Sequence, residues 1–140
     1  MAKFSVWMPQ GVLSEETETI ATPGGELKFK VIATNPGAAR FIVAYSEELN
    51  PAQLEDSATL FARIRDEIIK DTDFKFQGDR AITIPENHPG REFTLQNRQE
   101  TITMRIFAID RQIYLLGSEQ ATSDSPSPAA IAFFNSFKRL

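Results

Sequence analysis

The residues best suited to chemistry gather around His88, the only histidine among 140 residues. It lies in the run 87–92 (NHPGRE), where an imidazole, a guanidinium and a carboxylate are close in sequence. An imidazole titrates near neutral pH and acts as an acid or base when a partner orients it. We predict that a partner protein binds at an exposed sheet face or at the loops that carry His88, Arg91 and Glu92. In a small-ligand protein or enzyme, these three residues would instead lie at a cleft between a sheet and a helix. A polar, solvent-facing loop is the alternative.

Other catalytic and metal-binding groups do not form a recognisable set. The chain has no Cys, which excludes thiolate catalysis, disulfides and cysteine metal sites. With a single His, a zinc site would have to be completed by carboxylates alone, so we predict no metal. Acidic neighbours such as Glu15 and Glu16 are typical of a solvated face, and the glycines at 24 and 25 lack the spacing of a phosphate loop. We therefore expect no catalytic residue, no cofactor and no enzymatic activity.

Four arginines recur through the stretch 89–117, which we expect to form the middle of the sheet. They are Arg91, Arg98, Arg105 and Arg111. Cross-strand pairing with nearby carboxylates is their expected role, and such pairs add little to stability. A basic strip that binds an anion or an acidic protein is the alternative.

Composition describes an ordinary globular chain. Hydrophobic residues make up 41% and charged residues 24%, and 11 Phe supply bulky core material. The length fits one domain, 1–140. A net charge of -4 argues against a broad nucleic-acid surface, and no apolar run reaches the roughly 20 residues of a membrane span.

Alternating apolar residues predict strands before and after one long helix. Asn50, Pro51 and Gln53 supply an N-cap, a first helical residue and a return bond to the cap, and the helix should run to about Lys70. The apolar strand rows are Phe4, Val6 and Met8; Leu27, Phe29 and Val31; Phe41, Val43 and Tyr45; Ile82 and Ile84; Phe93 and Leu95; Ile102, Met104 and Ile106; Ile113 and Leu115.

Two further details concern the edges of this pattern. Trp7 is expected in the core, with an exposed anchor for a partner as the alternative. Pro128 should open a last helix that docks through Ile131, Phe134 and Phe137. Because most connections are too short for parallel crossovers, we predict an α+β fold, an antiparallel β-sheet with helices packed on its faces.

Four short motifs, taken in order, resemble the PsbP-like group of domains. They are residues 4–9 (FSVWMP), 89–93 (PGREF), 113–116 (IYLL) and 133–137 (FFNSF). The resemblance implies one PsbP-like domain over 1–140, an α/β/α sandwich. It also implies a non-catalytic protein-binding or assembly-accessory role at a photosynthetic or other membrane complex.

Several functional alternatives remain open. The first is the protein-binding domain, which has an unidentified protein partner and no nucleic acid. The second is a small-ligand protein or enzyme using a cleft near His88, Arg91 and Glu92. The third is an accessory in secretion or chaperoning. The location is expected to be thylakoid-lumenal or otherwise extracytoplasmic if a leader was removed, and cytoplasmic if Met1 is native.

Overall fold

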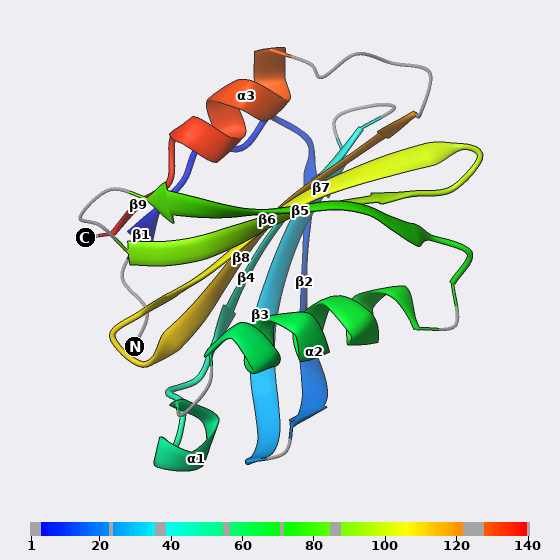
Figure 1. Cartoon of the computed structure of the whole chain (residues 1–140). Coiled ribbons are helices and arrows are strands. Elements are labelled where there is room, and N and C mark those ends of the chain that lie inside the picture. Colours follow the sequence, from blue (N-terminus) through cyan, green and yellow to red (C-terminus); the bar gives the residue numbers. More distant parts are fainter. Residues whose placement is uncertain are drawn as a thin grey trace.

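The architecture is a seven-stranded antiparallel sheet with helices on both faces, as seen in the computed structural model (Figure 1). The structure describes residues 4–22, 24–35, 39–54, 57–70, 72–84, 88–121 and 128–139. The strands are β1 (Phe4–Ser5), β2 (Val12–Thr22), β3 (Gly25–Asn35), β4 (Arg40–Ser46), β5 (Lys75–Ile84), β6 (His88–Gln96), β7 (Glu100–Ile109), β8 (Gln112–Ala121) and β9 (Lys138–Arg139). The helices are α1 (Pro51–Leu54), α2 (Ser57–Ile69) and α3 (Pro128–Asn135).

The sheet joins two antiparallel meanders in the order β2-β3-β4-β8-β7-β6-β5. The first meander is β2 to β4 and the second is β5 to β8, and β4 pairs with β8 where they meet. Each turn within a meander is short, which allows only antiparallel neighbours. The prediction of an α+β fold with an antiparallel sheet is confirmed.

One core lies between the sheet and α2. Its buried members from the sheet include Leu27, Phe93 and Ile106, and α2 contributes Phe61 and Ile64. These residues alternate along their strands and recur at helical spacing in α2, as amphipathic elements require. The predicted apolar rows of β3, β6 and β7 therefore face this helix.

A second core lies on the opposite face, beneath α3 and the β1–β9 pair. Tyr114 and Phe133 are fully buried there, and Phe107 is 1% exposed. The ring centres of Phe137 and Phe107 lie 4.7 Å apart in an edge-to-face arrangement. Both faces of the central strands are buried, so β8 is a continuous buried run from Gln112 to Ser118 instead of an alternating one.

The predicted capping box is present at the start of α1. Gln53 N donates to Asn50 Oδ1 at 2.9 Å, and Asn50 N donates to Gln53 Oε1 at 3.0 Å. The prediction of one helix from Asn50 to about Lys70 is wrong, because this segment forms two helices, the short α1 and the longer α2, which ends at Ile69 (Figure 1). Residues 55–56, between the two helices, lie outside the described residues. The predicted boundary at Asn50 is confirmed.

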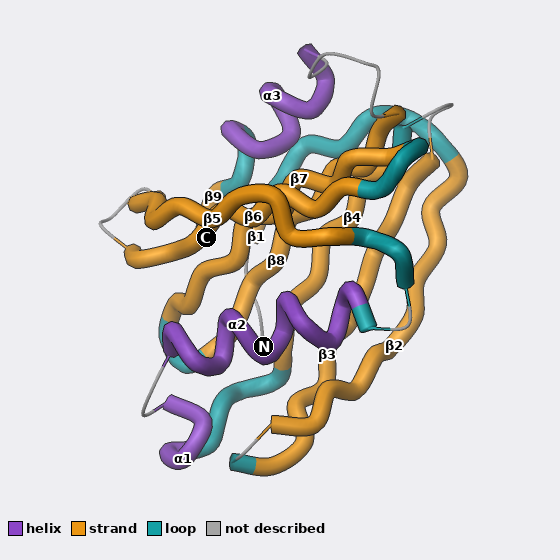
Figure 2. The backbone as a smooth tube through the Cα atoms, turned by 45° about the vertical axis from the view of Figure 1, so that its right-hand side comes forward, coloured by secondary structure: helices purple, strands orange, loops and turns teal. Residues whose placement is uncertain are grey.

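The predicted docking of the C-terminal segment is confirmed for Phe137, which is buried in the second core, and wrong for Ile131. Ala130 and Phe133 are buried, whereas Ile131 is 55% exposed and Phe134 only half-buried. Helix α3 begins at Pro128, and the residues facing the sheet recur at 130, 133 and 137. Phe134 consequently lies at the side of the helix, above the sheet rather than in the core. Figure 2 shows α3 and α2 as separate layers.

Candidate functional site

An arginine, a glutamate and a second arginine form one row across β5, β6 and β7. The strand register aligns Arg80 with Glu92 and Glu92 with Arg105. Arg80 donates to Glu92 Oε1 at 2.9 Å, and Arg105 Nε donates to Glu92 Oε2 at 2.8 Å. The side chains of Glu92 and Arg105 are 15% and 25% exposed, whereas that of Arg80 is 66% exposed. The inner pair is therefore shielded from solvent and the outer arginine is accessible.

The electrostatics of this row keep Glu92 ionised. Burial alone raises the pKa of the Glu92 carboxyl, but the hydrogen bonds and positive charges of Arg80 and Arg105 outweigh it. The net result is a pKa below the ordinary value. The hydrogen bond and charge of Glu92 in turn raise the pKa of Arg80. Charge-assisted hydrogen bonds of this kind are stronger than neutral ones.

Gly90 shapes the next row of the same face. It aligns with Ile82 on one side and with Phe107 on the other. A Cβ at Gly90 would lie 2.9 Å from the carbonyl oxygen of Ile106 and 3.0 Å from Phe107 Cβ. Glycine is therefore needed for the close approach of β6 to β7.

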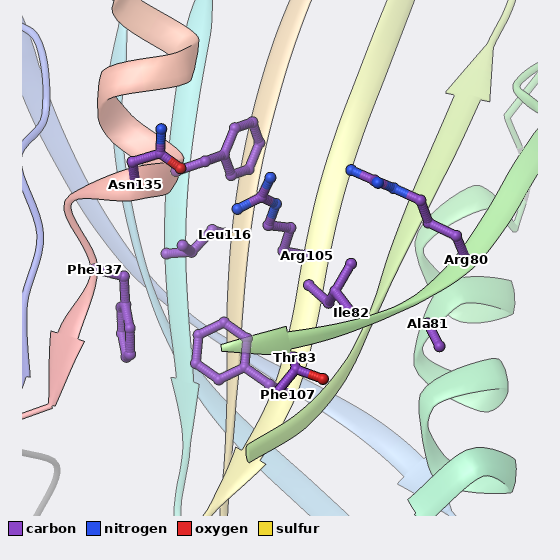
Figure 3. Close-up of a pocket in the computed structure, with 10 residues that line it drawn as sticks. Arg80, Ala81, Ile82, Thr83, Arg105, Phe107, Leu116, Asn135 and Phe137 are labelled. Carbon is purple, nitrogen blue, oxygen red and sulfur yellow. The ribbon is translucent and has the colours of Figure 1, made fainter. Parts of the chain in front are cut away.

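These rows form the floor of a cavity of about 440 Å³ beneath α3, which we call the α3 cavity (Figure 3). Its lining residues are Arg80, Ala81, Ile82, Thr83, Arg105, Phe107, Leu116, Phe134, Asn135 and Phe137. Arg105 carries its Cζ atom 4.9 Å from the centre of the Phe134 ring, a cation–π contact. Among the described residues that line it, none carries a carboxyl or imidazole group. The lining thus offers cations and apolar surface, which suit binding better than proton transfer.

The residues of the predicted site are divided between the two faces of β6. Arg91 pairs with Ile106 and faces α2, whereas Glu92 faces α3. Arg91 donates to Asp79 Oδ1 at 2.8 Å and lines a separate cavity of about 210 Å³ with Arg65 and Phe93. The side chain of His88 lies outside the described residues. Arg91 and Glu92 therefore do not line one cleft.

Of the other arginines in the stretch 89–117, Arg105 has an expected carboxylate partner. Arg105 pairs with Glu92, as cross-strand charge pairing predicts. Arg111 Nη2 donates instead to the carbonyl oxygen of Leu49 at 3.2 Å, and Arg98 is exposed on a turn. The basic strip is consequently limited to Arg80 and Arg105.

Trp7 is not in the core. Its side chain is 48% exposed, and its backbone N–H donates to Ser136 Oγ at 2.8 Å, just after α3. The expectation of burial is wrong because Phe4, Val6 and Met8 turn toward the second core and leave Trp7 on the outer side. An exposed tryptophan beside the α3 end of the cavity wall is typical of a protein interface.

A second carboxylate with a shifted pKa lies near the far end of β8. Burial raises the pKa of Glu119, and a hydrogen bond to Glu100 and the charge of that residue raise it further, while Arg40 opposes them. In the register, Arg40 is directly opposite Glu119. Within the described ranges, no group of three or more His, Asp or Glu side chains is arranged to hold a metal ion.

None of the residues that line the α3 cavity, Arg80, Arg105 and Phe134 among them, was predicted as a site residue. The available signal was the alternation of 90–93, which sends Gly90 and Glu92 to one face and Arg91 to the other. Following Glu92 across to its neighbours would have required the register of β5, which a bulge at 77 shifts.

No helix in the described part of the chain is long and apolar enough to cross a membrane. The chain matches no family model, no curated protein and no solved structure.

Proposed function

We propose that the chain is a non-catalytic binding domain of PsbP-like type that receives part of a partner protein in the α3 cavity. The observation that carries this proposal is that two cations, Arg80 and Arg105, line the same cavity as several apolar side chains. Sites that bind other molecules combine these features, since apolar contact supplies affinity and a few fixed polar groups supply orientation. An antiparallel sheet with helices on both faces is compatible with the sandwich that the sequence motifs suggest.

Exposed apolar side chains near α3 favour a protein as the partner. Ile131 on α3 is 55% exposed, and Trp7, tied to Ser136, is 48% exposed. Large side chains of this type serve as anchors in protein interfaces. An assembly-accessory role at a photosynthetic or other membrane complex is the form of this function that the sequence resemblance suggests.

Site-specific photocrosslinking tests the proposal. A benzophenone amino acid is placed at Thr83, which lines the cavity, and in a matched variant at Gln77, which is exposed on the same strand. Each chain is irradiated in an extract of its source cells. The expected result is one discrete adduct from position 83, strongly reduced by an added Arg105→Ala change and absent from position 77. Equal adducts from both positions, or none from position 83, would contradict the proposal.

A small-ligand site is the second candidate, because the cavity volume of about 440 Å³ lies in the range of small-molecule pockets, roughly 300–1,000 Å³. This candidate uses Arg80 and Arg105 in place of the predicted set. A discrete protein adduct in the crosslinking experiment would favour the first function over this one.

A further inference from the structure

The Arg105 guanidinium is held in a fixed orientation at the α3 cavity. Its Nε–H donates to Glu92 Oε2 at 2.8 Å, and its Cζ lies 4.9 Å from the centre of the Phe134 ring. A guanidinium carries five N–H donors in a rigid planar fork, so these two contacts set the plane of the fork. Figure 3 shows the end of the Arg105 side chain directed toward α3. A ligand entering the cavity therefore meets a cation that is already oriented.

The charge balance of the row favours a ligand with one negative charge. Arg80 and Arg105 carry two positive charges, and Glu92 carries one negative charge, which leaves one positive charge in excess. The other lining residues are uncharged. A dianion such as phosphate would bring its second charge close to the ionised Glu92, whose pKa is lowered by its two partners. A carboxylate matches both the single charge and the planar fork of arginine.

Apolar side chains line the cavity beside the two cations and allow an apolar group next to that anion. Ile82, Phe107, Leu116 and Phe137 all line the space, and Phe107 and Leu116 are each 1% exposed. A volume of about 440 Å³ is much larger than a bare carboxylate and leaves room for an aromatic or branched aliphatic body. Burial of such a body against these side chains is favourable because it removes apolar surface from water.

We infer that the α3 cavity binds a carboxylate carried on an apolar body, with Arg105 and Arg80 as its cationic ligands and Phe107, Leu116 and Phe137 as its walls. Glu92 is a positioning residue that accepts a hydrogen bond from each of the two guanidinium groups. This inference rests on the proposed function, which makes the cavity the binding site. The C-terminal apolar residue of a partner protein and a free organic acid are two sources of the same chemistry.

Titration of the whole chain with simple probes, followed by amide chemical shifts, tests the ligand class. The probes are 3-phenylpropionate, its amide 3-phenylpropionamide, and inorganic phosphate. We expect 3-phenylpropionate to bind with a Kd on the order of 1 mM, as its small size allows, and to shift the signals of β5, β7 and α3. The amide should bind at least tenfold more weakly. Equal binding of acid and amide, or tighter binding of phosphate, would overturn the inference.

Matched arginine variants locate the site. Arg105→Gln should weaken binding of 3-phenylpropionate at least tenfold, and Arg80→Gln should weaken it several-fold. Arg80 is 66% exposed, so its variant keeps the fold and remains informative if Arg105→Gln does not fold. Arg91→Gln is the control, because Arg91 lies on the opposite face of β6 and lines a different cavity. Loss of binding in Arg91→Gln with retention in Arg80→Gln would place the ligand elsewhere and contradict the inference.

A comparison with peptides distinguishes the C-terminus of a partner protein from a free organic acid as the ligand. A short peptide ending in Phe with a free carboxylate is compared with its C-terminally amidated form and with 3-phenylpropionate. Tighter binding of the free-carboxylate peptide than of 3-phenylpropionate supports a protein C-terminus, and the reverse order supports a free acid. If crosslinking from position 83 succeeds while every carboxylate probe fails, the proposed function stands and this inference is wrong. If the crosslinking fails and 3-phenylpropionate binds, the protein partner is wrong and the carboxylate site stands.

Discussion

Glu92 and Arg105 form a cross-strand ion pair in which Oε2 accepts from Nε at 2.8 Å, while the second carboxylate oxygen accepts from Arg80. Each oxygen therefore has its own cation, and the three side chains form a continuous row across three strands. Because Glu92 is 15% exposed and Arg105 25% exposed, removal of the carboxylate leaves a shielded cation without its partner. The row is both a stability element and the cationic part of the α3 cavity.

The first prediction is that Glu92→Gln lowers the free energy of unfolding by about 1–3 kcal/mol at pH 7. The pKa of Glu92 is lower in the folded chain than its ordinary value of 4.5. Its stabilisation is therefore fully present above pH 4.5 and is lost as the pH falls through the folded pKa. Urea unfolding of both chains across this range should show a difference that shrinks in acid. If the two chains differ in free energy of unfolding by the same amount at every pH, ionised Glu92 is not the source of the stabilisation.

Glu119→Gln should have the opposite pH dependence. The pKa of Glu119 is raised in the folded chain, so ionisation above its ordinary value of 4.5 costs stability, and the glutamine variant avoids that cost. We expect the variant to be more stable at pH 7 by roughly 0.2–1 kcal/mol, the usual scale of a cross-strand side-chain interaction, and equal to the parent chain in acid. Urea unfolding at pH 7 and pH 3 measures this, with exposed Glu47→Gln as a control. A loss of stability at pH 7 would show that Arg40 dominates instead.

Gly90 and Gly78 should respond differently to alanine. In Gly90→Ala the new Cβ would meet the Ile106 carbonyl oxygen at 2.9 Å, so the strands must move apart, at a cost of about 1–3 kcal/mol. In Gly78→Ala, at the β5 bulge, nothing lies within 4 Å of the new Cβ. Thermal unfolding of the two variants makes the comparison. Equal melting temperatures would mean that β6 and β7 can separate freely at Gly90.

The turn between β7 and β8 has two residues in the left-handed region, Asp110 at φ 48° and Arg111 at φ 69°. At such a position alanine keeps the backbone strain and glycine removes it. Both Arg111→Ala and Arg111→Gly lose the hydrogen bond to Leu49, so their difference isolates the strain. We expect the glycine variant to be more stable than the alanine variant by roughly 1 kcal/mol in urea unfolding. If Arg111→Ala is instead more stable than Arg111→Gly, as is normal for a residue within a strand, the turn is not strained.

Features set by neighbours in the sequence could be predicted well. The Asn50 and Gln53 capping box depends on residues three apart, and the positive φ of Gly25 (124°) follows from the turn glycines at 24 and 25. The alternation of Phe93 and Leu95 correctly identified a strand with a buried face. These features depend only on residues that are close together in the sequence, so the sequence pattern is enough to predict them.

Features set by pairing between distant strands could not be predicted in the same way. Arg91 and Glu92 are adjacent in sequence, yet strand geometry sends them to opposite faces, and their partners come from Asp79 and Arg105. The position of Phe134 above Arg105 depends on how α3 docks, and an error of one residue in its inward face moved Phe134 into the predicted core. The cavity exists only once register and helix docking are both known.

The pairing of β1 with β9 has a mechanical consequence. Phe4 aligns with Arg139 and Ser5 with Lys138 in antiparallel register, so the two ends of the described chain leave the ladder at the same end. A force applied through the flanking residues loads these pairs one after another, as in opening a zipper, and not all together in shear. In optical-trap pulling we expect a first rupture at low force that releases β1 and β9, followed by a higher-force rupture of the seven-stranded sheet. A domain built in this way would yield at its ends under tension long before its sheet gives way.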